Sequence, residues 1–339
     1  MRRHVPCAAF VVVVALVLVS CGGDATLPSE VTGDVAVQTA PPTTAAPECT
    51  AAEAAESEVA SYPALDPLPT PGSMPDGSTM AKIQARGRLI AGVSGDTLLF
   101  GARNPLTDQI EGFDIDMVTE IARAIFGEDL DGRIEYRVIT YADRLPSLEA
   151  DTVDVVAHTM TINCRRWLRI GFSSEYYHAG QKVLVKKGSG YTDITQLADA
   201  QGTVCAPEGS TNIDEVRSGA AKYDGLIVIG KPDISDCLVA MQQGEADATT
   251  GDDTVLAGFA AQDPNTEVVG LAFTNEPYGL GFNKDNADLV QFANGVIADM
   301  RTNGRWAEIY QTWLIDTGAL TDPAEPPAPP VADDSRPLP

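Results

Sequence analysis

A short segment with two threonines and an arginine contains the residues best suited to bind a small anion. Residues 157–177 read AHTMTINCRRWLRIGFSSEYY, with hydroxyls at Thr159 and Thr161 and a guanidinium at Arg166. The rigid fork of a guanidinium fits both oxygens of a carboxylate, and a threonine hydroxyl can satisfy the remaining lone pairs. No nucleophile with an adjacent base is present in the segment. The pattern predicts a carboxylate receptor, and a solvated basic face with an ordinary loop hydroxyl is the alternative.

The flanking sequence predicts that this receptor lies at the end of a buried strand. Val153, Val155 and Val156 form a short apolar run typical of such a strand, and the hydroxyl residues follow it. Residues 112–127 repeat apolar side chains at helical spacing, with Asp114 in position to cap the helix. Other strands are expected at 88–94, 134–140, 182–187, 204–206, 226–229, 246–250 and 278–282. Strands that alternate with helices predict an α/β fold with mostly parallel sheets, which bind ligands at the carboxyl ends of the strands.

The composition argues against several other functions. The 339-residue chain is long enough for two domains, and its 44% of hydrophobic residues can form a substantial core. Lys and Arg total 23 against 48 Asp and Glu, and the net charge of −25 argues against nucleic-acid binding, which needs a basic surface. The three histidines are scattered, and no CxxC, HExxH or glycine-rich phosphate-binding motif occurs. We therefore expect neither a metal ion nor a cofactor.

The N-terminus has the three-part layout of a secretory signal peptide over residues 1–20. Arg2 and Arg3 precede an apolar run that ends at Val19. This run is shorter than the roughly 20 residues that a membrane-spanning helix needs. The sequence LVSC that ends at Cys21 resembles the lipobox of bacterial lipoproteins. The resemblance implies that Cys21 is lipidated and anchors the chain at the extracytoplasmic face of the cell membrane.

Two stretches lack the apolar periodicity of folded structure. Residues 21–79 are rich in Pro, Thr and Ala and bury too little surface to offset the entropy of ordering. They predict a tether between the membrane and the folded part. Residues 321–339 contain seven prolines and predict a disordered tail.

The receptor segment resembles a known family signature. The pattern T-x-T-[IM]-x-x-x-R, followed by F-S-x-x-Y-Y, is similar to that of the bacterial extracytoplasmic solute-binding proteins, family 3, which serve ABC importers of polar amino acids. The segments GFDIDMVTEIARAIFG and GEADATTGDDTVLAG also match, and the resemblance covers about residues 82–315. The chain departs from the signature at Arg165, which follows Cys164, because the family usually has an acidic residue there.

The resemblance implies a two-lobed periplasmic-binding-protein fold of type II. Residues 80–178 and 275–320 would form the first lobe, and residues 179–274 the second. The chain would cross between the lobes twice, at 178–182 and 272–278. Two such crossings make a hinge, so we expect the lobes to close over the ligand.

The same resemblance suggests which residues contact the carboxylate of an amino acid. Thr161 and Arg166 fall at the family's positions for this group, with Thr159 beside them. In the family, the segment that contains Ser210 and Thr211 closes over the same carboxylate. Here this segment precedes a helix, whose N–H groups and dipole favour an anion. Plain helix capping is the alternative for these two residues.

The ammonium and the side chain of the amino acid need other contacts. A buried ammonium requires a carboxylate, and Asp252 matches the family residue that meets it, with Asp253 as the nearest rival. Candidates for contacts with the ligand's side chain are Phe100 and Phe113 as apolar walls, and Arg103 and Asn163 as polar groups. Core or surface roles are the alternative for these four. The resemblance is closest to actinobacterial binders of glutamine, glutamate and aspartate, which favours an acidic or amide ligand.

The functional prediction combines these parts. We expect a monomeric, lipid-anchored extracytoplasmic protein that captures a small polar L-amino acid and delivers it to an ABC permease, without catalysis. A receptor subunit that signals through a membrane sensor is one alternative, because both roles use the same closed state. A dehydratase built on the same fold is another.

The four cysteines outside the signal peptide and the lipidation site allow three pairings in an oxidising compartment. Cys205 and Cys237 both fall in the expected second lobe, so a bond between them leaves the hinge unrestrained. Cys49 would then pair with Cys164 and hold the tether beside the receptor arginine. Four free thiols are the alternative. A Cys164–Cys205 bond would join the lobes and contradict closure.

Overall fold

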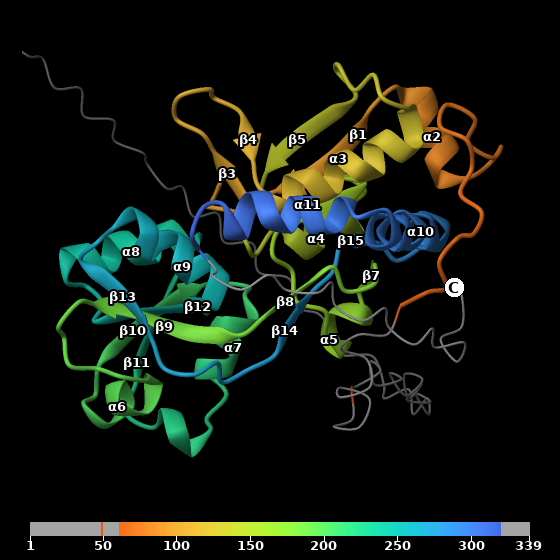
Figure 1. The fold of residues 1–339 in the computed structure, drawn as a ribbon. Coiled ribbons are helices and arrows are strands. Elements are labelled where there is room, and N and C mark those ends of the chain that lie inside the picture. Colours follow the sequence, from red (N-terminus) through yellow and green to blue (C-terminus); the bar gives the residue numbers. More distant parts are fainter. Residues whose placement is uncertain (1–48, 50–60, 320–339) are drawn as a thin grey trace, which may run out of the picture. The chain divides into compact units, whose positions relative to one another are not determined.

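Figure 1 shows a computed structural model, which describes residue 49 and residues 61–319. Contacts between Cα atoms divide the chain into residues 1–46 and 47–339, so every described residue belongs to the second unit. The predicted signal peptide, the lipidation residue Cys21 and the predicted tail lie outside the described residues. None of the helices in the described part is long and apolar enough to cross a membrane.

The first lobe is built on a five-stranded mixed sheet. Its strands, in spatial order, are β5 (Ile134–Val138), β1 (Leu89–Val93), β6 (Val155–Ala157), β15 (Gly281–Asn283) and β7 (Ile170–Phe172). β1 is parallel to β5 and β6, whereas β15 is antiparallel to β6 and β7. All residues of β1 are buried, as expected for an apolar strand with neighbours on both sides. The lobe's helices are α2 (Thr79–Arg86), α3 (Phe113–Phe126), α4 (Arg144–Glu149), α5 (Cys164–Trp167), α10 (Ala287–Asn303) and α11 (Arg305–Tyr310).

Helix α3 begins at a position that requires glycine. Gly112 has a φ of +141°, and a Cβ atom there would lie 2.2 Å from the carbonyl oxygen of Phe100. Asp114, which the sequence suggested as the cap, lies instead inside the first turn and is fully buried. Its carboxylate accepts hydrogen bonds from the backbone N–H of Thr159 at 2.8 Å and from the hydroxyl of Tyr176. Asp114 thus ties the helix to the segment that follows β6.

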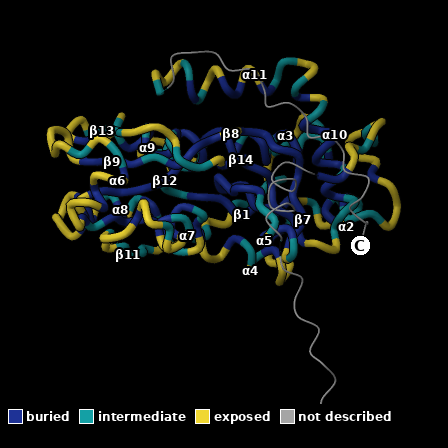
Figure 2. Tube along the Cα trace, turned by 90° about the horizontal axis from the view of Figure 1, so that it is seen from below, coloured by how far each residue is buried: buried dark blue, intermediate teal, exposed yellow. Residues whose placement is uncertain are grey.

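The second lobe repeats this design with another five-stranded sheet. Its strands, in spatial order, are β11 (Ile227–Lys231), β10 (Thr203–Pro207), β12 (Ala248–Asp252), β9 (Gln181–Lys186) and β13 (Thr266–Val269). β10 is parallel to β11 and β12, and β9 is antiparallel to β12 and β13. The helices of this lobe are α6 (Ile194–Asp199), α7 (Thr211–Val216), α8 (Ile234–Gln243) and α9 (Asp253–Gln262). Figure 2 shows that the central strands of both sheets are buried, whereas the edge strands β5 and β11 are partly exposed and other exposed residues lie mainly in loops and on outer helix faces.

Two strands run between the lobes. β8 (Tyr177–Ala179) and β14 (Glu276–Tyr278) pair in antiparallel fashion and lie between the two sheets in Figure 1. Both strands overlap the crossings expected at 178–182 and 272–278. The fold is therefore the two-lobed α/β arrangement that the sequence predicts.

The lobes also touch through a small three-stranded sheet in the first lobe. It comprises β2 (Asp96–Thr97), β3 (Gly101–Arg103) and β4 (Ile110–Glu111). The carboxylate of Asp96 accepts a hydrogen bond from the backbone N–H of Ser235, at the start of α8, at 3.1 Å. At Gly258 in α9, a Cβ atom would lie 3.2 Å from the carbonyl oxygen of Leu98. The structure therefore represents lobes in contact.

Residues 61–78 correct the predicted extent of the tether. Ser61 and Tyr62 are buried, and the Ser61 hydroxyl donates to the carbonyl oxygen of Phe172 at 2.9 Å. A Cβ atom at Gly295 of α10 would lie 2.5 Å from the carbonyl oxygen of Leu65, so the helix packs tightly against this segment. The proline-rich composition suggested a spacer, but apolar residues between the prolines reach the core of the first lobe.

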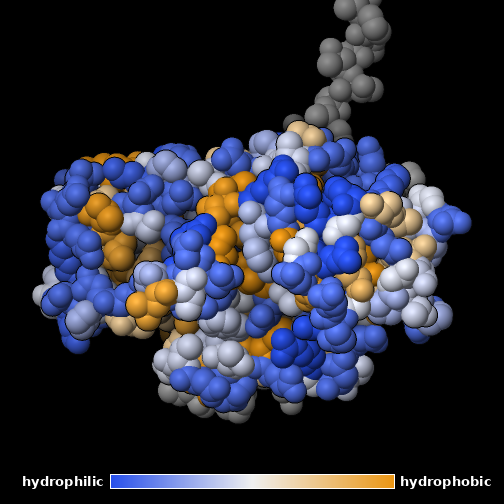
Figure 3. Space-filling view, turned by 90° about the horizontal axis from the view of Figure 1, so that it is seen from above, coloured by the Kyte–Doolittle hydropathy of each residue, from blue (hydrophilic) through white to orange (hydrophobic). Residues whose placement is uncertain are grey.

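Few large apolar side chains are exposed in the part of the chain that the structure describes. Hydrophilic residues cover most of the face drawn in Figure 3, with apolar residues between them. Five large apolar side chains of the described residues are exposed, namely Leu106, Val138, Ile227, Val239 and Leu271. Within the described part, no group of three His, Cys, Asp or Glu residues is placed to hold a metal ion.

Candidate functional site

A cavity of about 910 Å³ lies where residues of both lobes and of β14 meet. The first lobe contributes Thr161 and Arg166 to its wall, the second contributes Gly209 and Thr211, and β14 contributes Glu276. These residues come from distant parts of the chain, so only the folded arrangement brings them together. The cavity is therefore lined by residues from two segments that the sequence analysis singled out, the receptor segment and the segment at the start of α7.

Arg166 is held in this wall by its own short helix. The side chain of Asn163, the N-cap of α5, accepts a hydrogen bond from the Arg166 backbone N–H at 3.0 Å. The guanidinium donates to the carbonyl oxygen of Thr161 at 2.7 Å and to that of Gly209, in the other lobe, at 3.4 Å. Among the described residues, it forms no ion pair with a carboxylate. Burial lowers the pKa of Arg166 to about 9, helped by the charge of Arg144, so a bound anion would stabilise its charged form.

The threonine hydroxyls contact a carboxylate that the sequence analysis did not single out. Thr161 Oγ1 donates to Glu276 Oε2 at 2.5 Å, and Thr211 Oγ1 donates to the same oxygen at 2.7 Å. The two hydroxyl oxygens are 3.3 Å apart. Glu276 is 2% exposed. No periodicity or motif marked this glutamate, and these two hydroxyl partners are more than sixty residues away from it in sequence.

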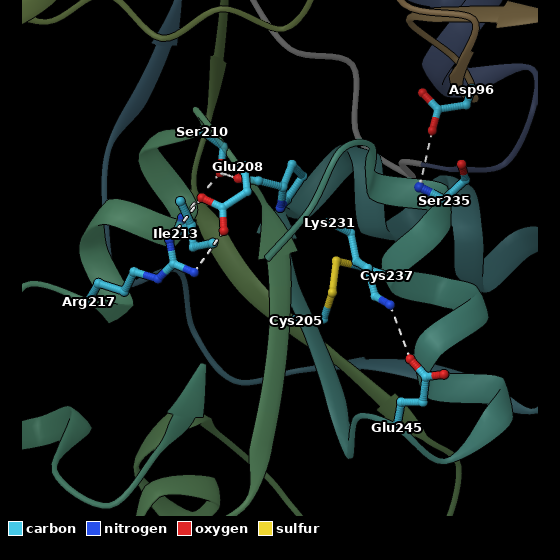
Figure 4. The surroundings of a disulfide bond; sticks show 11 residues. Asp96, Cys205, Glu208, Ser210, Ile213, Arg217, Lys231, Ser235, Cys237 and Glu245 are labelled. Carbon is cyan, nitrogen blue, oxygen red and sulfur yellow. Dashed lines mark hydrogen bonds and ion pairs between the residues drawn. A yellow bond between two sulfur atoms is a disulfide. The ribbon is translucent and has the colours of Figure 1, made fainter. Parts of the chain in front are cut away.

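Ser210 behaves as the helix-capping alternative suggests. Its hydroxyl accepts from the backbone N–H of Ile213 at 3.1 Å and donates to the carbonyl oxygen of Pro207 at 2.7 Å (Figure 4). It does not line the cavity. The neighbouring Gly209 has a φ of +80°, and a Cβ atom there would lie 2.7 Å from the Cα atom of Ala142 in the first lobe. Glycine therefore allows the two backbones to meet.

Asp252 ends β12 and is buried, and it is not among the residues that line the cavity. Its carboxylate accepts hydrogen bonds from the Asn212 amide at 2.8 Å and from the Tyr278 hydroxyl. Burial raises its pKa to about 7, and the nearby charge of Glu276 adds to the shift. Its rival Asp253 accepts hydrogen bonds from the backbone N–H groups of Gly180 and of Thr254. Neither carboxylate has a cation beside it within ion-pair distance among the described residues.

Thr159 has a hydroxyl without a described hydrogen-bond partner. The residue is buried with a φ of +42°, which a β-branched residue adopts only at a cost. Its Oγ1 is buried and forms no hydrogen bond with any described residue. A buried hydroxyl without a partner is unfavourable, so Thr159 has capacity for a ligand atom.

Arg144 is a second buried guanidinium that the sequence analysis missed. It is 1% exposed and lies over the ring of Tyr141, with its central carbon 4.6 Å from the ring centre. It donates to the carbonyl oxygens of Tyr141, His158 and Gly209, each at 3.0 Å. Burial lowers its pKa. No motif or spacing in the sequence marks it; the structure places it at the first position of the short helix α4.

Comparison with known proteins decides the family. Residues 89–316 match the family model described as bacterial extracellular solute-binding proteins, family 3. The chain belongs to this family. It is 34% identical over 247 residues to the ABC transporter glutamine-binding protein GlnH of Bacillus subtilis (strain 168), which covers 73% of this chain and 86% of the relative. It is 38% identical over 208 residues to the glutamine-binding protein of Geobacillus stearothermophilus, covering 61% and 77% of the two chains.

Solved structures agree with the two-lobed fold. The P235GK mutant of ArgBP from T. maritima superposes with a TM-score of 0.63 at 28% identity, covering 69% of this chain and 98% of the other. An ancestral arginine-binding protein bound to glutamine gives a TM-score of 0.61 at 29% identity, covering 67% and 98%.

In this family 3 chain, the two candidate apolar walls lie in the core. Phe100 and Phe113 are fully buried, with ring centres 5.7 Å apart, and both pack against Tyr177. Neither residue lines the cavity, whose aromatic side chain is Tyr141. Of the two polar candidates, Asn163 lines the cavity, whereas Arg103 pairs with Asp108 on the exposed hairpin.

Both disulfides favoured by the sequence analysis are present. Cys205 in β10 is bonded to Cys237 in α8, entirely within the second lobe (Figure 4). Cys49 is bonded to Cys164 at the start of α5, and both residues line the cavity. Neither bond crosses between the lobes, so the disulfides leave the hinge unrestrained.

Proposed function

We propose that this family 3 protein captures a polar amino acid of the amide or acidic type between its lobes and delivers it to an ABC importer. Arg166 carries the proposal. It is a buried guanidinium in the wall of a cavity between the lobes, and no described carboxylate pairs with it. The relatives named as glutamine-binding, and the related structure bound to glutamine, support a ligand of this class.

Each polar group of the amino acid has a candidate partner. Arg166 would pair with the α-carboxylate, and Thr161 and Thr211 line the same wall. Asp252 would accept from the α-ammonium, because a nearby cation stabilises a buried carboxylate in its ionised form. The Thr159 hydroxyl, buried without a described partner, supports an additional acceptor or donor in this region. Ser210 supports the site indirectly by capping α7.

Closure of the lobes would complete this site. The carbonyl oxygen of Gly209, in the second lobe, accepts hydrogen bonds from Arg144 and Arg166 of the first lobe. A ligand that contacts both lobes favours the closed state in proportion to its extra affinity for that state. The domain boundaries expected from the sequence, with lobe 2 at 179–274, fit this mechanism.

The wider setting follows from the N-terminal sequence. We propose a monomer that is anchored through lipidated Cys21 at the extracytoplasmic face of the cell membrane and binds its ligand without turnover. The lipobox-like LVSC sequence supports the anchor. The relatives named here are binding proteins and support a role without catalysis.

Titration calorimetry against the twenty amino acids tests the proposed function. We expect one polar amino acid to bind tightly, and Arg166→Ala to weaken it by about 100-fold or more, since truncation leaves a buried charge unpaired. Arg217→Ala is the matched control, because Arg217 pairs with Glu208 outside the cavity. Unchanged affinity in Arg166→Ala would remove the assignment, and slow turnover of an added keto or hydroxy acid would favour an enzyme.

A further inference from the structure

Glu276 is a buried anion in the wall of the proposed binding cavity. It lies on β14, the strand that connects the lobes, and it is 2% exposed. No described lysine or arginine lies within ion-pair distance of it, and the charges of Arg144 and Arg166 act on it from farther away. Its hydrogen-bond partners are hydroxyl groups. A carboxylate buried without a cation is costly unless hydrogen bonds or a ligand compensate it. A hydrogen-bond donor on a bound ligand would therefore stabilise the buried Glu276 carboxylate.

The hydrogen bonds of Glu276 determine what its neighbours can offer to a ligand. Thr274 Oγ1 donates to one carboxylate oxygen at 2.6 Å, and Thr161 and Thr211 donate to the other. Each threonine hydroxyl has a single proton and two lone pairs. Because those protons are used on Glu276, the hydroxyls of Thr161 and Thr211 can only accept from a ligand. This part of the wall thus presents acceptors and a negative charge.

Other charged groups of both signs line the cavity. The second lobe contributes Asp214 and Glu215, and Glu215 is paired with Lys222 at 3.1 Å. On the first-lobe side, Arg169 is already paired with Glu149 at 2.6 Å, and Arg165 lines the cavity with its residue exposed. Arg166 remains for the α-carboxylate. A second carboxylate on the ligand would therefore meet acidic groups and acceptors in this part of the wall.

We propose that Glu276 makes this site select an amino acid whose side chain ends in an amide over one whose side chain ends in a carboxylate. The inference rests on the proposed function and narrows its ligand class. Glutamine and glutamate have nearly the same shape and differ in one terminal group. The amide N–H₂ of glutamine can donate to Glu276 or to the threonine oxygens, whereas the corresponding oxygen of glutamate would be repelled.

Calorimetric titration with glutamine and glutamate tests this role in three proteins: wild type, Glu276→Gln and Glu245→Gln. Glu245 makes the same chemical change outside the cavity, where it pairs with Lys231. We expect wild type to prefer glutamine by about 100-fold or more, because a site built to accept an N–H rejects the analogue that lacks it. Glu276→Gln should lower that ratio by about 10-fold or more, and Glu245→Gln should leave it unchanged.

The ratio of two affinities measured on one variant is insensitive to partial loss of folded protein. Glu276→Asp, which keeps the charge, should retain the preference for glutamine even if both affinities fall. An unchanged ratio in Glu276→Gln, or a parallel loss of both ligands, would overturn the selective role of Glu276. A wild-type protein that prefers glutamate would also overturn it. If wild type bound neither amino acid nor any other, the proposed function itself would fail.

Discussion

Two cavities lie between the lobes, and they differ in the charges that line them. The first, of about 910 Å³, combines the buried guanidinium of Arg166 with the carboxylate of Glu276. The second, of about 690 Å³, is lined by Asp96, Asp143 and Asp233. Its guanidinium, Arg103, is already paired with Asp108 on the exposed hairpin. The first wall contains a positive and a negative group and can compensate both charges of a zwitterion. The second wall carries mainly negative charge. Volume alone therefore does not identify the ligand site.

Among changes that compare the two cavities, the largest effect should come from adding one methyl group where the lobes meet at the first cavity. Gly209→Ala places a Cβ atom 2.7 Å from the backbone of Ala142 and forces an alanine to a φ of +80°. Strain of this kind costs about 1–3 kcal/mol, so we expect amino-acid affinity to fall by about 30-fold. Calorimetry measures the loss.

The matched control lies at the second cavity. At Gly95 an added Cβ would approach Val138 Cγ1 at 3.0 Å, and that valine is exposed, so it can move aside. Gly95→Ala should change affinity by less than about 3-fold. If Gly95→Ala weakened binding as much as Gly209→Ala, the two cavities would not differ in the way that we describe.

A smaller effect should appear in the pH dependence of binding. Burial raises the pKa of Asp252 to about 7, and an ammonium beside it would favour the ionised form. Below that pKa the carboxyl must lose its proton before it pairs. Affinity should therefore increase by about 10-fold from pH 6 to pH 8 and level off above, with a proton released on binding. Calorimetry in buffers of different ionisation enthalpy counts that proton.

Two variants test whether Asp252, rather than an aspartate of the second cavity, releases the proton. Asp252→Asn should abolish the proton release, because the titrating group is gone. Asp233→Asn, in the second cavity, should leave it intact. Proton release that persists in Asp252→Asn would show that Asp252 does not meet the ammonium.

The smallest effect concerns stability at the second cavity. Burial raises the pKa of Asp233 to about 6, with Asp96, Asp236 and Asp143 adding to the shift. The folded state thus favours the protonated form of the Asp233 carboxyl group, and the ionised form lowers the free energy of unfolding. This loss of stability is absent below the unfolded pKa and fully present above pH 6. Asp233→Asn should raise the melting temperature by about 2 °C at pH 8 and have no effect at pH 4. Scanning calorimetry measures both values, and a lower melting temperature at pH 8 would contradict the account.

The sequence predicted the parts of the site that depend on local patterns. The receptor pattern identified Thr161 and Arg166, which the structure places in one cavity wall. The fold class followed from alternating strands and helices. The pairing of Cys205 with Cys237 followed from their expected place in one lobe, and the structure contains that bond.

Residues that depend on long-range contacts escaped the sequence analysis. Glu276 meets Thr161 across 115 positions of the chain, and no spacing rule connects them. Arg144 donates to the carbonyl oxygen of Gly209 in the other lobe, and its own helix does not reveal this contact. Phe100 and Phe113 were candidates for apolar ligand walls, but aromatic packing places them in the core. Composition also gave a wrong prediction for residues 61–78. Their prolines suggested a spacer, but a few apolar side chains pack this segment against the first lobe.

The most direct test is a crystal structure of the protein with glutamine bound. The account predicts that the ligand lies in the first cavity, with its α-carboxylate within hydrogen-bond distance of Arg166 and its side-chain amide directed to the wall formed by Glu276, Thr161 and Thr211. A ligand in the second cavity, or one in the first whose α-carboxylate does not contact Arg166, would contradict it.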